Sequence, residues 1–350
     1  MGMIGDALLV LRQAQGITQE ELVERVDANM TQAALSRYEN NLREPDDQAI
    51  AVLAQALGVT PEFLTYRFHM FGAVAADVHM RRRRTARATD WKRVEAELNV
   101  FRMHSSYLLN RIPLQSQNQL VSIDPADSTP EDAADIVRAA WRMPIGPVRS
   151  LYRWVEAAGI FVAEDDFGTS KIDGLSQWAG DHAVILVNSV QSTDRKRLTV
   201  AHEVGHLVMH GDYVADDIEA QANAFAAEFL MPKVVISPEL NRLSLGKLSD
   251  LKAQWGVSMQ ALYERAYALG KVDSEARRKF YRMMAARGWK TKEPCSERIP
   301  PEKPVLAESI GARLSQAGLT SEEISKLVGV VSTVRSPFIP EPQRPRLMMV

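Results

Sequence analysis

The segment AHEVGH, residues 201–206, constrains the fold of this chain more than any other feature. It places His202 and His206 four residues apart, with Glu203 beside the first. On an α-helix, positions i and i+4 lie on the same face, so both imidazoles can reach one metal ion. A carboxylate next to that face can accept a proton from a water that the metal polarises. Because apolar residues around the motif recur with helical spacing, we predict a helix that carries a zinc site.

A catalytic zinc has three protein ligands and leaves one position for water, so a third ligand is needed. The candidates after the motif are His210, Asp216, Asp217, Glu219 and Glu228. On a straight helix His210 lies about 12 Å from His202, too far to share the ion. Residues 211–215 can reverse the chain, which favours Glu219 from the next helix, although a solvated acidic helix start would also explain that residue. Glu228 lies about 14 Å further along the same helix and is not expected to join it.

The bulk composition is that of an ordinary globular chain. Its 350 residues are 46% hydrophobic and 25% charged, which allows two or three domains. The single cysteine, Cys295, excludes internal disulfides and cysteine-based zinc clusters and fits a reducing compartment. The sequence shows neither an apolar run long enough to span a membrane nor the pattern of a signal peptide, so we expect a cytoplasmic protein.

Residues 3–65 are predicted to form five short helices. Thr18 and Glu21 have the spacing of a capping box, and two short helices separated by a turn are typical of a helix-turn-helix. The motifs LR (11–12), GITQEEL (16–22), LSRYEN (35–40), REP (43–45) and LAQALGV (53–59) closely resemble the XRE/Cro family of phage-repressor-like domains. We therefore assign residues 1–68 to an XRE-type helix-turn-helix domain.

In such a domain the third helix enters the major groove of DNA. The residues expected at bases or phosphates are Gln19, Thr31, Gln32, Ala33, Ser36, Arg37 and Arg43. Residues 1–68 nevertheless carry a net charge of −5, whereas residues 79–111 carry +6, mostly from the arginines at 81–84 and Arg87. Phosphate neutralisation supplies much of the affinity for DNA. Binding would therefore need a homodimer or help from these arginines, and the alternative is a module that pairs with another XRE-type protein.

The remainder of the chain is predicted to hold three further regions. Residues 69–129 are expected to form a basic linker and a connecting helix, and residues 130–290 an α+β domain with a small sheet and C-terminal helices. Residues 291–350 are a Pro-rich extension with one expected helix. The strand near 182–188 precedes the motif helix. One hypothesis is that it pairs with an extended substrate, and the alternative is an ordinary sheet strand without an exposed edge.

A second resemblance covers residues 130–270. The segments DRKRLTVAHEVGHL (194–207) and EAQANAFAAEFLMP (219–232) are similar to the ImmA/IrrE family of zinc metallopeptidases. Upstream WRMPIGPV (141–148), DGLS (173–176) and VN (187–188), and downstream VS (257–258), AL (261–262) and Arg265, match the same family. The resemblance implies a mainly α chain with a zincin-like α+β domain, and His202, His206 and Glu219 as the ligands of Zn²⁺. Family members often carry an XRE domain in front, as here.

This resemblance implies a zinc endopeptidase with Glu203 as the general base. The developing oxyanion would be stabilised by His210, Tyr213, Tyr263 or Tyr267, among which the sequence does not choose. The expected role is regulation of transcription, of a mobile element or of a stress response by cleavage of an XRE-type repressor protein. The alternative is a DNA-binding regulator whose metallopeptidase-like domain is a sensor without proteolysis.

Overall fold

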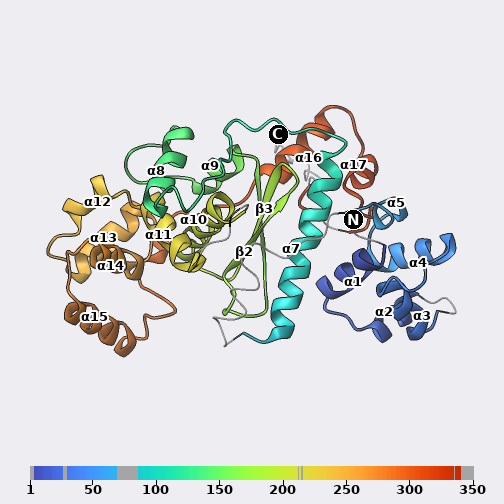
Figure 1. The fold of residues 1–350 in the computed structure, drawn as a ribbon, viewed down its shortest axis with the longest axis horizontal. Helices are drawn as coiled ribbons and strands as arrows, with labels where there is room; N and C mark the ends of the chain where they lie inside the picture. Colours follow the sequence, from blue (N-terminus) through green and yellow to red (C-terminus); the bar gives the residue numbers. More distant parts are fainter. Residues whose placement is uncertain are drawn as a thin grey trace, which may run out of the picture. The chain divides into compact units, whose positions relative to one another are not determined.

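The structure is a computed structural model that describes residues 4–26, 30–68, 86–211, 213, 216–334 and 336–339. The arginines at 81–84, which the sequence analysis associates with DNA, lie outside these residues. The chain is mainly α-helical with one small sheet, and it divides into two compact units (Figure 1). The first unit comprises Met1–Phe71, Asn99–Leu114 and Val305–Val350, and the second comprises Gly72–Leu98 and Gln115–Pro304. Among the described helices none is long and apolar enough to cross a membrane.

The first unit begins with the predicted five helices. These are α1 (Ile4–Ala14), α2 (Gln19–Val26), α3 (Gln32–Glu39), α4 (Asp47–Leu57) and α5 (Pro61–Leu64). The capping box forms, with the Glu21 amide donating to Thr18 Oγ1 at 3.2 Å and the Thr18 amide to Glu21 Oε2 at 2.6 Å. Leu8, Leu22, Leu35 and Leu53 are fully buried at the centre of this bundle.

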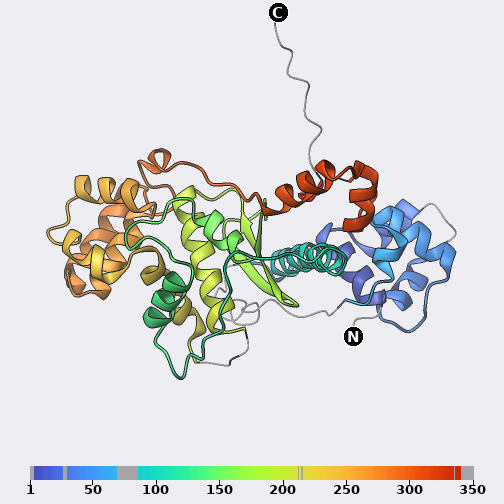
Figure 2. The same ribbon diagram turned by 90° about the horizontal axis from the view of Figure 1, so that it is seen from above.

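Residues 306–330 lie in the same unit as this helical domain. The helices α16 (Leu306–Gln316) and α17 (Ser321–Val328) belong to the first unit, and Val330 bridges to Val59 as in an antiparallel ladder (Figures 1 and 2). On the helix α7 (Ala88–Leu109), whose second half lies in this unit, His104 donates from Nδ1 to Val328 O at 2.8 Å. Burial lowers the pKa of His104 to about 4, so this contact is made by the neutral ring.

The extension after residue 290 therefore differs from the expected one-helix segment. Its described residues contain two α-helices, and its part before Val305 belongs to the second unit. The sequence marks only α17 clearly, through its capping box from Thr320 to Glu323, whereas α16 begins without a side-chain cap. Which unit the other residues of the extension belong to depends on contacts with residues far away in the sequence, and no local sequence pattern reveals these contacts.

The second unit is built around a three-stranded sheet. Its strands are β1 (Ile160–Asp165), β2 (Gly174–Ala179) and β3 (His182–Asn188), in the order β1-β3-β2. The central strand β3 is parallel to β1 and antiparallel to β2. Residues 182–188 are therefore the ordinary sheet strand of the second alternative and do not pair with a substrate, because both edges of β3 are already hydrogen-bonded within the sheet. A run of apolar residues that is buried on both faces marks a central strand.

Helices flank this sheet, and the largest core of the chain lies between them. The neighbours of the sheet in sequence are α8 (Pro130–Ala140), α9 (Leu151–Ala157), α10 (Thr193–Met209) and α11 (Ile218–Leu230). The later helices α12 (Lys233–Glu239), α13 (Leu245–Trp255), α14 (Met259–Ala268) and α15 (Ser274–Ala286) gather on the side of α10 and α11 away from the sheet in both views (Figures 1 and 2). The motif helix α10 is therefore covered by protein along most of its length.

Candidate metal centre

The two helices that carry the predicted ligands pack very closely. A Cβ at Gly205 of α10 would lie 3.0 Å from Cδ1 and 3.2 Å from Cβ of Phe225 on α11, so any larger residue would push the helices apart. This close approach brings the first turn of α11, which carries Glu219, to the face of α10 that presents the two histidines. Small residues at this contact are thus part of how the sequence builds the site.

The structure brings His202, His206 and Glu219 together. The Nε2 atoms of the two rings lie 3.0 Å apart, and Glu219 Oε1 lies 3.2 Å from His206 Nε2. Glu219 Oε2 lies 3.6 Å from His202 Nε2. In a tetrahedral zinc site with bonds of about 2.0–2.1 Å, neighbouring ligand atoms are about 3.3 Å apart. The three side chains therefore have the spacing of one face of such a tetrahedron, and they form a group that could hold a metal ion.

Hydrogen bonds around the rings fix which nitrogen of each histidine carries its proton. Asn223 Oδ1, an acceptor, lies 3.1 Å from His202 Nδ1, so His202 donates from Nδ1. The neutral ring then presents the lone pair of Nε2 toward Glu219 and the second histidine. An Nε2 lone pair is the form in which imidazole binds a metal.

A chain of hydrogen bonds through Gln221 and His210 fixes which nitrogen of the buried His206 carries its proton. Gln221 donates from Nε2 to Asp216 O at 3.3 Å, which turns its Oε1 toward His210 Nε2 at 2.9 Å. His210 must therefore donate from Nε2 and accept at Nδ1, where His206 Nδ1 lies 3.0 Å away. Burial lowers the pKa of His210, which keeps this ring neutral in the relay. Both motif histidines thus point an Nε2 lone pair at a carboxylate, and this arrangement of three electron donors fits a bound cation.

Glu203 is held by a contact that the sequence analysis did not single out. Its side chain is 3% exposed, and Ser176 of β2 donates from Oγ to Glu203 Oε2 at 2.7 Å. The strand approaches α10 closely at Gly174, where a Cβ would lie 2.6 Å from Thr199 Cγ2. Only glycine permits this approach, so the Asp-Gly-Leu-Ser run at 173–176 carries the signal that could have identified Ser176.

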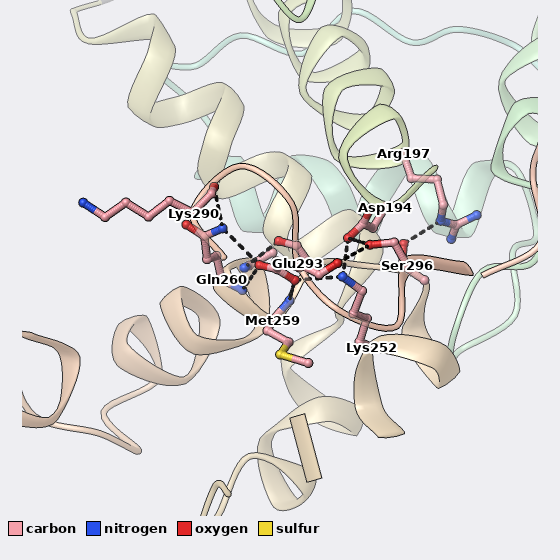
Figure 3. Close-up of polar contacts among 11 residues, drawn as sticks. Asp194, Arg197, Lys252, Met259, Gln260, Lys290, Glu293 and Ser296 are labelled. Carbon is pink, nitrogen blue, oxygen red and sulfur yellow. Dashed lines mark hydrogen bonds and ion pairs between the residues drawn. The ribbon is translucent and has the colours of Figure 1, made fainter. Parts of the chain in front are cut away.

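An ion network fixes the beginning of α10 (Figure 3). Lys252 of α13 has a fully buried side chain, and its Nζ lies 2.7 Å from Asp194 Oδ2 and 2.8 Å from Glu293 Oε2. Glu293 also accepts from the amides of Met259 and Gln260 at the start of α14. Burial alone would raise the pKa of Asp194, but hydrogen bonds led by that from Lys252 lower it overall. The network ties α10, α13 and α14 together behind the metal ligands.

A cavity of about 140 Å³ opens beside the ligands. Its walls come from α10, α11, the start of β2, the residues just before that strand, and α7. The residues that line it are Trp91, Ile172, Asp173, Gly174, Arg195, Leu198, Thr199, His202, Glu203, Glu219 and Asn223. The predicted general base and two of the three predicted ligands therefore face one cavity.

None of the four predicted oxyanion-stabilising residues is among those that line this cavity in the described part of the chain. His210 is occupied by His206 and Gln221. Tyr263 stacks on Phe280 at 4.0 Å between ring centroids, and Tyr267 shares a hydrogen bond with Ser274 at 3.2 Å. Tyr213 is partly buried. His210 therefore contacts and supports His206. Tyr263 and Tyr267 lie on α14 and do not line the cavity.

The predicted DNA-contacting residues lie mainly on the outer side of the first domain. Five of them are exposed: Thr31, Gln32, Ala33, Arg37 and Arg43. Thr31 caps α3 by accepting from the Ala34 amide at 3.2 Å, and Ser36 is partly buried. Gln19 donates to Glu39 Oε2 at 2.8 Å, and Glu39 is also held by Arg12 at 2.6 Å. Gln19 is thus oriented by the buried ion pair of Arg12 and Glu39, which lies at the C-terminal end of α3.

Fold and site together define a metallopeptidase-type α+β domain that follows a helix-turn-helix domain. Residues 155–267 match the family model of the IrrE N-terminal-like domain, and residues 8–64 match a helix-turn-helix family model. The second unit thus contains a segment similar to the IrrE N-terminal-like domain, and a segment similar to a helix-turn-helix domain precedes it.

One relative is the radiation response metalloprotease IrrE of Deinococcus radiodurans. It is 38% identical to this chain over an alignment of 79 residues, and the match covers 18% of this chain and 23% of that protein. The chain thus spans about a quarter of the length of the curated relative that it matches. The metallopeptidase family implies a metal cofactor, for which His202, His206 and Glu219 form a suitable group.

Proposed function

We propose that this protein is a zinc-dependent endopeptidase that regulates transcription by cleaving a repressor protein. The observation that carries the proposal is the convergence of His202 Nε2, His206 Nε2 and the Glu219 carboxylate, with Glu203 on the same cavity. Two nitrogens and one carboxylate favour zinc over magnesium or calcium, which prefer oxygen ligands. A zinc ion bound by these three residues would polarise a water and a peptide carbonyl.

The residues of the chain then have separate roles. Glu203 accepts the proton of the attacking water and passes it to the leaving amine. Ser176 donates to Glu203 Oε2 and so holds the carboxylate in one orientation. Asn223 and the His210–Gln221 relay keep the two histidines in the tautomer that binds the metal.

A peptide can meet the general base in the cavity beside the metal ligands, since Gly174 of β2 and Glu203 both line it. Ser176 of the same strand contacts Glu203. An XRE-type repressor protein encoded near the gene is the substrate that we propose.

The helix-turn-helix domain directs this activity, either by binding DNA or by pairing with an XRE-type protein. Support for DNA contact comes from the exposed outer residues of α3, Gln32, Ala33 and Arg37. The net charge of −5 over residues 1–68 argues for weak binding by one copy, so we propose that a homodimer reads DNA.

The test compares wild-type protein with Glu203→Gln. Both are loaded with zinc, and cleavage of purified XRE-type repressors is followed by gel electrophoresis and mass spectrometry. We expect cleavage by the wild type and none by the variant, with equal zinc content in both. Equal cleavage by both proteins would remove Glu203 from the mechanism. Full zinc binding without cleavage of any repressor would favour the sensor without proteolysis.

A further inference from the structure

One wall of the cavity comes from outside the segments that match known families. Ten of its eleven lining residues lie within 155–267, and the other, Trp91, lies on α7 outside both matched segments. Trp91 is only 3% exposed. Two residues further along, the Arg93 guanidinium lies against Gly168, where a Cβ would be 3.3 Å from Arg93 Nη2. The first half of α7 belongs to the second unit and adds an aromatic wall to the cavity.

The cavity extends from the general base toward the beginning of α10. Leu198 lies one turn before His202 on the same face, and Arg195 lies two turns before Glu203. Eight residues of helix span about 12 Å, so the cavity continues beyond the metal ligands by more than the length of one peptide unit. A residue of a bound peptide next to the scissile bond can therefore place its side chain there.

The walls of this extension are apolar, and the two charged side chains at its edge are paired with each other. Trp91, the buried Ile172 and the partly buried Leu198 supply the apolar surface. At the rim, Arg195 and Asp173 already pair at 2.8 Å. A charged substrate side chain would lose its hydration without meeting an unpaired opposite charge, so the extension favours an apolar side chain.

The size of the cavity limits which side chain fits. Pockets that hold drug-sized ligands have volumes of about 300–1,000 Å³, whereas this one has about 140 Å³. This volume includes the space beside His202, Glu203 and Glu219, so the extension has room for one side chain and not for several residues. We propose that this cavity is a specificity subsite that accepts one small or medium-sized apolar side chain beside the scissile bond, and that Trp91 sets its size limit. This inference rests on the proposed peptidase function.

The test replaces Trp91 with phenylalanine in the full chain. The matched control is Trp255→Phe, since Trp255 is 1% exposed in the same unit but does not line the cavity. Zinc-loaded Glu203→Gln protein first selects peptides from a mixture of proteome-derived peptides. The best peptide is then resynthesised with alanine, valine, leucine, phenylalanine, tryptophan or aspartate at each position near its centre. Dissociation constants are measured by fluorescence anisotropy in the Glu203→Gln background, and kcat/KM is measured with Glu203 intact.

We expect Trp91→Phe to change which substrate side chain is preferred, and not to weaken the binding of all peptides. At one position the wild type should favour alanine, valine or leucine over phenylalanine, tryptophan and aspartate. Trp91→Phe should improve the ratio for phenylalanine over valine by about 10-fold, the usual effect of reshaping an apolar pocket by one ring or methylene unit. Trp255→Phe should leave this ratio unchanged.

Two results would overturn the inference. One is an identical preference profile in Trp91→Phe and the wild type. The other is a uniform gain for all peptides with the same ranking, which would make Trp91 an obstruction of the cavity instead of a wall of a subsite. Because binding is measured in a variant that does not cleave, the subsite is tested even if no peptide is hydrolysed. Absence of cleavage by the wild type would count against the proposed function alone.

Discussion

Replacing Lys252 with methionine should destabilise the second unit strongly. The Lys252 side chain is fully buried and makes charge-assisted hydrogen bonds to Asp194 and Glu293, whose side chains are 2% and 5% exposed. Methionine has a similar length but leaves both carboxylates without their cation (Figure 3). Removing one partner of a buried ion pair costs about 3–5 kcal/mol. That is a large part of the roughly 5–15 kcal/mol by which a typical domain is stable.

The loss should depend on pH in a defined direction. In the wild type the pKa of Asp194 is lowered, so its ionised form stabilises the fold above its unfolded pKa, and this contribution is lost as the pH falls through the folded pKa. In Lys252→Met burial dominates and raises the pKa of Asp194, so acidification protonates it and relieves the unpaired charge. The difference between variant and wild type should therefore be largest near neutral pH and should shrink below about pH 5.

Urea unfolding followed by circular dichroism measures this difference. A triple variant that also carries Asp194→Asn and Glu293→Gln is the control, since it removes the carboxylate charges together with the cation. It should regain most of the stability, because neutral replacement of a buried ionic cluster is close to neutral in free energy. A loss below about 1 kcal/mol in Lys252→Met, or no recovery in the triple variant, would refute the role given to this network.

Three further predictions follow from single contacts. Gln221→Leu removes the acceptor that fixes the His206 tautomer, so zinc affinity measured by competition with a chelator should fall about 10–100-fold. His104→Asn keeps a donor but does not titrate. The wild type, with a folded pKa of about 4, should lose on the order of 2 kcal/mol of first-unit stability between about pH 7 and pH 5, and the variant should not. Gly205→Leu should cost about 1–3 kcal/mol in thermal unfolding because its side chain meets Phe225.

The helices and the grouping of His202, His206 and Glu219 were accessible from the sequence because their signals are local or periodic. The four-residue spacing of His202 and His206 fixes their common face, and the distance along a helix excludes His210. Glu219 follows from the short reversal between two helices. Caps such as Thr18 and Thr320 mark where helices begin. These features need only the residues near them in the chain.

The parts that were missed depend on neighbours distant in sequence. Ser176 reaches Glu203 only because β2 packs across α10, and Trp91 reaches the cavity from a helix about a hundred residues before the motif. The strand at 182–188 has the apolar run of a buried strand, but its central position depends on pairing with both β1 and β2. Likewise, the bridge from Val330 to Val59 joins the two ends of the chain.

The most direct test of the account is the zinc content of Glu219→Ala beside that of the wild type and of Glu203→Gln. Mass spectrometric metal analysis after dialysis against a weak chelator should find one zinc per chain in the wild type and in Glu203→Gln, and little in Glu219→Ala. The reason is that, among the residues that the structure describes, Glu219 completes the group formed by His202 and His206. If Glu219→Ala retained zinc with unchanged affinity, the ion would be held elsewhere and the proposed mechanism would fail.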